Sequence, residues 1–252
     1  SQSWDKMSNK LRVNLLTQHY AFMGLYGLLE KPWNGFAASS QFLALYDAKD
    51  RRGPCPDAMG TDIDFQDINK KYGWFLGPVK EDGKIAVDEN GTPVEITRTF
   101  KSQTQATWND GARLMKYETE VNPTVNQYMD NDFVLFRYAD VLLFDAEILL
   151  AEGFADKAID QINVVAKRAY GKDNFYAKGQ SEAAVKEILI NERLKEFTAE
   201  GKIWWDFIRL GVVFDRVPSL KGKENNKNIL LWPISKASLD DNQNLTQTEI
   251  EL

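Results

Sequence analysis

The fold is decided by the stretch Phe133-Val-Leu-Phe-Arg-Tyr-Ala-Asp-Val-Leu-Leu-Phe-Asp-Ala-Glu-Ile-Leu-Leu-Ala-Glu-Gly153. Nearly all of its residues are apolar, and its acidic residues occur singly rather than in runs. An apolar segment of this length without proline predicts a helix, and a terminal glycine is a common stop signal. We therefore predict a helix that is buried on most sides and ends at Gly153.

Three more segments with the helical period follow. Residues 155–169 carry apolar side chains on one stripe and charged side chains outside it. Ser181 is a candidate N-cap for the next amphipathic segment, residues 182–197, and residues 203–210 form the last one. Because helices joined by a few residues fold back antiparallel, we predict a mainly α chain with a helical core over about residues 133–211.

Three glutamates in this core recur at every fourth position. On a helix, the carboxylates of Glu192, Glu196 and Glu200 form one row with neighbours about 6 Å apart. Paired carboxylates are what a glycosidase needs. We favour a structural role, because arginines are interleaved with the row and catalytic pairs usually come from different elements. The residues assigned to this structural ion-pair motif are Arg137, Glu192, Arg193, Glu196, Glu200, Asp206 and Arg209.

The composition is that of an ordinary globular chain and excludes several functions. The 252 residues carry a formal charge of −6, and the basic residues are dispersed, which argues against a nucleic-acid partner. No apolar run is long enough for a membrane span. With one cysteine and one histidine, we expect no internal disulfide, no Cys/His or Ser/His/Asp centre and no structural zinc site. No metal or cofactor is predicted.

The N-terminal part is predicted to form short helices. Helical spacing covers residues 4–29 until Gly24 and Gly27 interrupt it, and a short helical face follows at residues 42–46. At the other end of the chain, residues 212–252 are predicted to form a tail.

A long insertion, about residues 53–132, is predicted between these helices and the helical core. Its first part is a loop in which Asp62, Asp64 and Asp67 alternate loosely. These acids could hold calcium, but the glycine and the closing glutamate of an EF-hand are missing. A solvated acidic loop is therefore the favoured interpretation.

A change of period within this insertion indicates a small β-meander over residues 74–100. Short apolar segments alternate there with the dipeptides Asp82-Gly83 and Asn90-Gly91, which are typical of hairpin turns. Residues 101–132 are polar and are predicted to form a second loop.

Several short motifs are spread along the chain. They are Trp33-Asn-Gly-Phe36, Arg137-Tyr-Ala-Asp140, Asn191-Glu-Arg-Leu-Lys-Glu196, Glu200-Gly201, Trp204-Trp205-Asp206, Arg209-Leu-Gly211 and Leu231-Trp-Pro-Ile-Ser235. Together they resemble the SusD/RagB family of outer-membrane nutrient-binding lipoproteins, over most of the chain. Two positions depart from the family pattern: Ile203 stands where an arginine is usual, and Ser235 replaces the second proline of the closing motif.

The resemblance implies a fold as well as a family. It implies a SusD-like α-α superhelix of TPR-like helical hairpins with long loops and the small β-meander as an insertion. Family members are considerably longer, so this chain resembles their C-terminal half, and we treat residues 1–252 as a single SusD-like C-terminal domain. The N-terminal half of the same protein, which carries the lipid anchor in the family, is absent from this sequence.

The resemblance also implies a non-enzymatic role in nutrient uptake, as in the starch utilisation system. Family members are lipid-anchored on the outer membrane and exposed at the cell surface. They bind glycans and deliver them to a partner SusC-like TonB-dependent transporter. The implied ligand of this chain is an oligosaccharide or polysaccharide, with a peptide or another oligomer in the same uptake role as the alternative.

A glycan-binding surface needs exposed rings, because the C–H face of a sugar stacks on a ring while its hydroxyls need amide and carboxylate partners. Loop aromatics are better candidates than Trp204, Trp205 and Trp232, which lie in scaffold motifs and are expected in the core. The stacking candidates are Trp33, Tyr72, Trp74 and Trp108, and the hydrogen-bonding candidates are Asn34, Asn69, Asp67 and Asn109.

Two other functions stay open. The first is a glycan-active enzyme that uses Glu192 or Glu196 with a distant acid, and it predicts that these glutamates line an open cleft. The second is a helical-repeat scaffold that binds only protein through stacked helix pairs. That function predicts that the loop tryptophans are buried.

Overall fold

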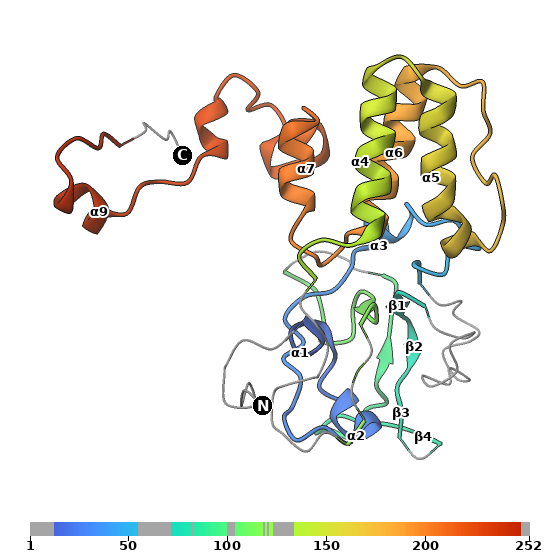
Figure 1. Cartoon of the computed structure of the whole chain (residues 1–252). Helices are drawn as coiled ribbons and strands as arrows, with labels where there is room; N and C mark the ends of the chain where they lie inside the picture. The colour runs from blue at the N-terminus through green and yellow to red at the C-terminus, as the bar shows by residue number, and fades with distance from the viewer. Residues whose placement is uncertain are drawn as a thin grey trace, which may run out of the picture. The chain divides into compact units, whose positions relative to one another are not determined.

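The computed structural model describes residues 13–54, 72–81, 83–99, 104–117, 119, 121–122 and 134–247. Helices dominate these residues and the strands are few and short, so the predicted fold class is confirmed (Figure 1). The chain divides into two compact units, Ser1–Glu200 and Gly201–Leu252. The assignment of the whole chain to a single domain stays a prediction. No helix in the described part of the chain is both long enough and apolar enough to cross a membrane.

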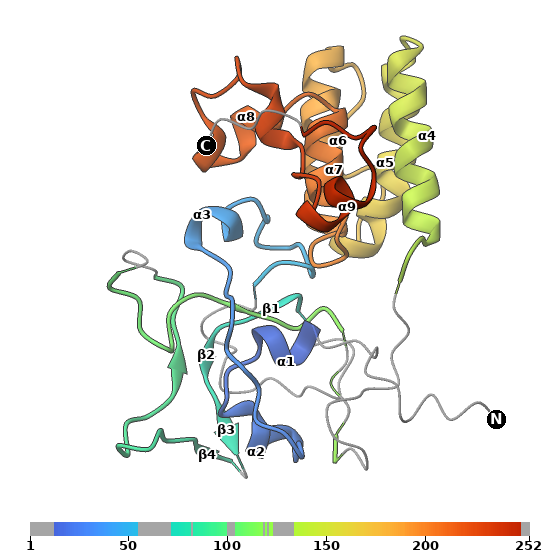
Figure 2. The ribbon, with the colours of Figure 1, turned by 90° about the vertical axis from the view of Figure 1, so that its left-hand side faces the viewer.

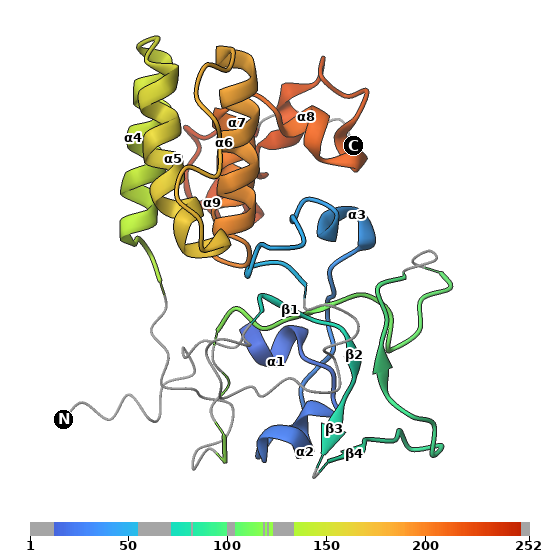
Figure 3. The same cartoon turned by 90° about the vertical axis from the view of Figure 1, so that its right-hand side faces the viewer.

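The first unit contains three long helices that lie side by side (Figures 1 and 3). They are α4 (Tyr138–Ala151), α5 (Ala155–Tyr170) and α6 (Glu182–Glu196). Helix α4 packs against α5 as the predicted hairpin, and α6 contacts both of them. The predicted limits of α5 and α6 are confirmed to within one residue.

Capping interactions explain where two of these helices begin. The backbone N–H of Arg137, which is extended, donates to Asp140 Oδ2 at 2.9 Å. Helix α4 therefore begins later than predicted, and residues 134–137 lie outside it. The side chain of Ser181 accepts from the backbone N–H of Ala184 at 3.3 Å and caps α6, as predicted.

The prediction that the first helix is buried on most sides is wrong. Of the residues of α4, Asp140, Leu143 and Ala146 are the buried ones. Apolar residues on the opposite side, such as Val141 and Ile148, are exposed. An almost wholly apolar helix has no polar stripe to mark its outer face, so its sequence does not show how many of its sides are covered.

The rest of the first unit contains short elements. Its helices are α1 (Val13–Thr17), α2 (Phe22–Tyr26) and α3 (Ser40–Leu43). Its strands have two residues each and form three antiparallel pairs. These pairs are β1 (Trp74–Phe75) with β6 (Arg113–Leu114), β2 (Gly77–Pro78) with β5 (Glu95–Ile96), and β3 (Lys80–Glu81) with β4 (Lys84–Ile85). Most of these strands fall in the predicted meander. Strand β6 does not, because it lies in the segment predicted to be a polar loop.

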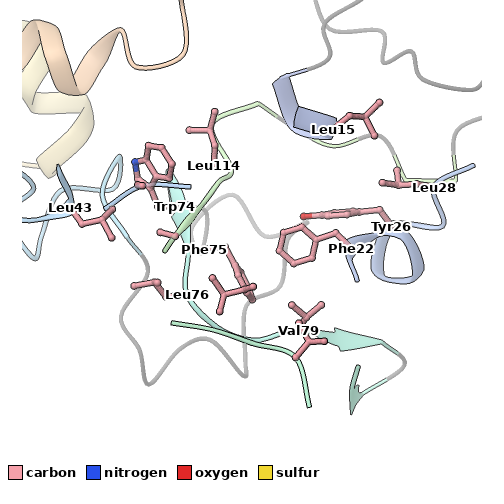
Figure 4. Packing of buried hydrophobic residues seen from close by; sticks show 14 of the residues in the cluster. Leu15, Phe22, Tyr26, Leu28, Leu43, Trp74, Phe75, Leu76, Val79 and Leu114 are labelled. Atoms are coloured by element: carbon pink, nitrogen blue, oxygen red, sulfur yellow. The ribbon is translucent and has the colours of Figure 1, made fainter. Parts of the chain in front are cut away.

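A hydrophobic cluster holds these short elements together (Figure 4). The ring of Phe22 in α2 packs edge-on against that of Phe75 in β1, with centroids 5.1 Å apart. The indole N–H of Trp74 donates to the hydroxyl of Tyr46 at 3.4 Å. Much of this core therefore comes from the predicted loop and β-hairpin insertion, chiefly from its β-meander. The sequence indicated the strands, but only the tertiary structure packs them against the short helices.

The second unit consists of short helices (Figure 2). They are α7 (Ile203–Arg209), α8 (Val213–Arg216), η4 (Pro218–Leu220), η5 (Lys227–Leu230) and α9 (Lys236–Asp241). The expectation that its tryptophans lie in the core is wrong for Trp205 and Trp232, which are 61% and 81% exposed, whereas Trp204 is half-buried. A helix as short as α7 has one buried face, and Asp206 and Phe207 occupy it.

Candidate functional site

The row of glutamates is buried: Glu192 and Glu196 lie on α6, and Glu200 lies just beyond its end. Glu192, Glu196 and Glu200 are 0%, 1% and 8% exposed. Their partners come both from the region of the long helices and from the segments that connect it to the rest of the first unit. A carboxylate buried to this extent must be paired with a cation or be protonated.

Cations from several segments pair with this row. Arg52 lies 2.9 Å from Glu192 and 3.0 Å from Glu196. The other ion pairs join Arg137 to Glu196 and Glu200, Arg168 to Glu196, Lys195 to Glu192 and Lys116 to Glu200. The hydroxyl of Tyr176 also donates to Glu192 at 2.6 Å.

The electrostatics around Glu196 and Glu200 favour their ionised forms. Burial alone would raise the pKa of Glu196, but the charges of Arg168, Arg52 and Arg137 lower this pKa below its usual value. The pKa of Glu200 is lowered as well, because hydrogen bonding by Arg137 and the charge of Lys116 outweigh its burial. A general acid needs a raised pKa and access to substrate. These buried and ion-paired carboxylates instead fasten α6 to its neighbours.

A different part of the first unit displays aromatic rings. Trp33 and Phe36 are each 47% exposed on one loop, and Trp108 is 69% exposed on another. The indole N–H of Trp33 donates to Glu30 at 3.2 Å. We call the surface formed by Trp33, Phe36 and Trp108 the aromatic surface.

Asn34 and Arg113 tie the two loops of the aromatic surface together. Asn34 Nδ2 donates to the carbonyl of Trp108 at 2.8 Å, and Asn34 Oδ1 accepts from Arg113 Nε at 2.7 Å. Arg113 also donates to the carbonyls of Trp108, Asp110 and Gly111. Asn34 has a φ of 52°, a left-handed conformation that asparagine adopts more readily than most residues.

Arg113 is a buried cation beneath this surface. It is 2% exposed, and burial, only partly offset by the charge of Asp110, lowers its pKa to about 10. Its guanidinium is planar with several donors in a fixed arrangement, so it holds the loop carbonyls in one geometry. The rings of the aromatic surface are therefore carried by a rigid support.

His19 completes the support. It is fully buried, and its Nδ1 accepts from the backbone N–H of Ala21 at 3.1 Å. Burial, assisted by the charges of Arg113 and Lys31, lowers its pKa to about 4, although a hydrogen bond with Asn109 acts in the opposite direction. The imidazole is therefore neutral at physiological pH.

A comparison with known protein families identifies the family of this chain. The model of the SusD family matches residues 29–250. The chain belongs to the SusD family. The match contains both the glutamate row and the aromatic surface, and it extends through nearly all of the second unit.

Two named relatives share the SusD family with this chain. SusD-like protein P38 of Formosa agariphila is 27% identical over 148 residues, which cover 56% of this chain and 28% of the relative. Starch-binding protein SusD of Bacteroides thetaiotaomicron is 29% identical over 162 residues, which cover 59% of this chain and 28% of that protein. The matched regions are less than a third of the length of these relatives.

Solved SusD-family structures show the same fold. A SusD superfamily protein from Bacteroides fragilis superposes with a TM-score of 0.57 at 21% identity, over 94% of this chain and 45% of that one. A second SusD-like protein from the same species gives a TM-score of 0.51 at 16% identity, over 80% of this chain and 41% of that one.

The predicted stacking residues differ in position. Trp33 and Trp108 are exposed on loops, as expected for a platform. Trp74 is wrongly predicted as one, because it is 4% exposed and its ring packs edge-on against Phe42 with centroids 5.6 Å apart. Tyr72 is half-buried and packs against the same hydrophobic cluster. Aromatic residues that the sequence places in loops or at loop edges thus lie partly on the surface and partly in the core.

The predicted hydrogen-bonding residues also divide. The side-chain amide of Asn34 bridges the two loops, so it positions the rings. Asn109 is half-buried beside His19. Asn69 and Asp67 lie outside the described residues, as do Asp62 and Asp64 of the calcium alternative. Where the structure describes the chain, no group of three or more His, Cys, Asp or Glu side chains could hold a metal ion.

The remaining members of the ion-pair motif have local roles. Arg209 Nη2 lies 2.9 Å from Asp206 Oδ1 within the second unit. The guanidinium of Arg193 lies over the rings of Phe144 and Phe197, 4.6 and 4.9 Å from their centroids. Such a contact stabilises a buried cation through the electron density of the ring faces.

Several important residues have no signal in the sequence. Arg113 lies in a segment predicted to be a polar loop, and no local pattern marks it as the support of two loops. Arg52, from the loop after α3, and Lys116, from the insertion, pair with the glutamate row although both are far from α6 in the sequence. His19 is fully buried, and no pattern around it in the sequence indicates this.

Proposed function

We propose that this SusD-family chain binds an oligosaccharide on the aromatic surface of Trp33, Phe36 and Trp108 without changing it chemically. The proposal is carried by the three exposed rings on two loops that Asn34 and Arg113 hold together. A rigid display of rings lowers the entropy cost of binding, because the platform is formed before the ligand arrives.

The chemistry of the surface suits a sugar. Its rings offer flat apolar faces for the C–H groups of a pyranose, and Asn109 lies beside them with an amide for hydroxyl groups. Starch-binding protein SusD of Bacteroides thetaiotaomicron, one of the relatives, is named for binding a polysaccharide of glucose. This name supports a glycan as the ligand here.

The second part of the proposal is a role in nutrient uptake. We infer that the protein acts at the surface of the outer membrane, held there by a lipid anchor, and passes its ligand to a SusC-like TonB-dependent transporter. Membership of the SusD family supports this role. The chain covers 45% of the length of a solved SusD superfamily protein, and we infer that parts of the fold outside this chain share in ligand binding and transporter contact.

We infer that the protein does not hydrolyse its ligand, because the glutamates of the row are buried and paired with cations. Glu192 and Glu196 are buried against Arg52, and the lowered pKa of Glu196 suits a permanent anion. A glycosidase acid would need a raised pKa and contact with the glycosidic oxygen. Incubation with starch, xylan and mannan should accordingly release no reducing ends.

Native affinity gels that contain starch, xylan or mannan test the binding. We expect retardation of the protein by at least one polysaccharide, and loss of this retardation in Trp108→Ala and Trp33→Ala. Trp205→Ala is the matched control, because Trp205 is similarly exposed at 61% but lies in the second unit. It should bind like the unchanged protein.

Two outcomes would overturn the proposal. One is migration unaffected by every polysaccharide, together with binding of a peptide library in solution, which would favour the alternative ligand. The other is retardation that persists in both tryptophan variants, which would place the ligand elsewhere on the chain.

A further inference from the structure

A concave surface lies among the short elements of the first unit, apart from the rings of the aromatic surface. It is a pocket of about 540 Å³ between α2 and the β3–β4 hairpin, and Tyr20, Gly24, Glu81, Lys84, Ile85 and Val87 are among its lining residues. Helix α2 and strand β3 are in contact there (Figure 1). Small-molecule pockets in proteins are typically about 300 to 1,000 Å³, so this one has room for a sugar residue.

A glycine gives the pocket its shape. A Cβ at position 24 would lie 2.4 Å from the carboxylate carbon of Glu81, a distance that no real contact allows. The carboxylate of Glu81 therefore reaches the backbone of α2 only because residue 24 is glycine. This close approach places the carboxylate of Glu81 against the helix wall of the pocket.

The lining groups are of both polar and apolar kinds. Glu81 accepts hydrogen bonds, Lys84 donates them, and their charges cancel. The hydroxyl of Tyr20 stays protonated, because burial and the charges of Asp88 and Glu89 raise its pKa. Ile85 and Val87 add exposed apolar surface, at 47% and 58%. A neutral ligand with many hydroxyl groups and apolar C–H faces matches this combination.

A short segment of the chain, Glu30 to Trp33, links one wall of the pocket to the aromatic surface. Trp33 is hydrogen-bonded to Glu30, and the next residue, Lys31, places its Nζ 4.7 Å from the centroid of the Tyr20 ring. Tyr20 also contacts His19, with ring centroids 3.9 Å apart. The segment from Glu30 to Trp33 thus touches both places, and one extended ligand could lie along it.

We propose that the pocket lined by Tyr20, Glu81 and Lys84 is a second subsite, which takes a neutral sugar residue of the same oligosaccharide that the aromatic surface binds. This inference rests on the proposed function and makes it more specific. It requires the ligand to be a chain, because one sugar residue cannot occupy the aromatic surface and the pocket at the same time.

Isothermal titration calorimetry of the full chain with short and long sugars tests this inference. The probes are the tri- and hexasaccharides of α-1,4-glucan, β-1,4-xylan and β-1,4-mannan. We expect the Kd for a bound hexasaccharide to rise about tenfold in Lys84→Ala and in Glu81→Gln, while the Kd for the matching trisaccharide stays within about twofold. Lys186→Ala, an exposed lysine on α6, is the matched control and should leave both unchanged.

The two proposals fail in different ways. Absence of binding by every hexasaccharide would overturn the proposed function and the subsite with it. Hexasaccharide binding that weakens in Trp108→Ala but not in Lys84→Ala or Glu81→Gln would overturn the subsite alone. Thermal melts followed by circular dichroism establish that each variant is folded, and both changed side chains are exposed, so folding should be retained.

Discussion

Arg52 and Glu196 are 144 positions apart in the sequence, and their side chains form an ion pair of 3.0 Å between Nη1 and Oε2. Arg52 also contacts Glu192 and Asp50. The guanidinium is thus a shared partner of three buried carboxylates from two distant segments. It fastens the C-terminal part of α6 to the loop that follows α3.

We expect Arg52→Ala to lower the free energy of unfolding by about 3 to 5 kcal/mol, because it leaves buried carboxylates without their cation. Urea denaturation followed by circular dichroism measures this change. Arg51→Ala is the matched control: Arg51 is exposed and holds Ala169 only through its backbone N–H, so its change should stay within about 0.5 kcal/mol. Equal losses in the two variants would contradict the role of Arg52.

The positions of two tryptophans give a second prediction. Trp74 lies in the hydrophobic cluster and Trp108 is 69% exposed. Trp74→Ala should lower the free energy of unfolding by about 3 to 5 kcal/mol through the cavity that it leaves, whereas Trp108→Ala should change it by no more than about 0.5 kcal/mol. Urea denaturation of both variants checks this. A large loss in Trp108→Ala would mean that its ring is part of the core.

The sequence was sufficient to predict the bounds of a helix that has a clear polar stripe. In α5, charged residues lie outside a regular apolar stripe, and both ends of the helix were predicted to within one residue. In α4 the stripe is missing, so the existence of the helix was predicted but not its exposed side, where Val141 and Ile148 lie. The spacing of apolar residues shows which face of a helix packs against its neighbours only when the opposite face is polar.

The site was predictable in part, because burial depends on distant residues. Trp74 and Trp108 both stand at loop edges in the sequence, but β1 pairs with β6 and draws Trp74 into the core. The contact of Asn34 with Arg113 spans 79 positions and follows no local pattern. The exposed loop rings could therefore be proposed from sequence, whereas their support could not.

The bridge made by Asn34 gives a third prediction. Asn34→Gly should cost about 1 to 3 kcal/mol of unfolding free energy, because the buried guanidinium of Arg113 loses an acceptor. Asn34→Ala should cost about 1 kcal/mol more, since alanine is strained at a φ of 52°. Both variants should also weaken polysaccharide retardation, because the loops of Trp33 and Trp108 are no longer tied.

Asn174 is the matched control for this experiment. It has the same φ of 52° but is exposed. Asn174→Ala should therefore show the backbone cost alone, and Asn174→Gly should be close to neutral. If Asn34→Gly is as harmless as Asn174→Gly, the side chain of Asn34 does not stabilise the loops.

The pH dependence of stability gives the last prediction, and it concerns His19. Its pKa is about 4 in the folded chain against 6.5 when it is exposed, so the unfolded state binds more protons between these two values. Stability should be unaffected by His19 above pH 6.5 and should fall as the pH is lowered toward 4, by on the order of 3 kcal/mol in total. Urea denaturation at intervals from pH 7 to pH 4.5 measures this slope. The paired carboxylates Glu196 and Glu200 lose their contribution only as the pH falls below their ordinary pKa of 4.5, so they do not act in this range. His19→Gln should flatten the curve.

Because His19 is the only histidine of the chain, its ring protons can also be titrated directly by NMR in the unchanged protein. A titration midpoint near 6.5 would show that the imidazole is not held neutral beneath the aromatic surface.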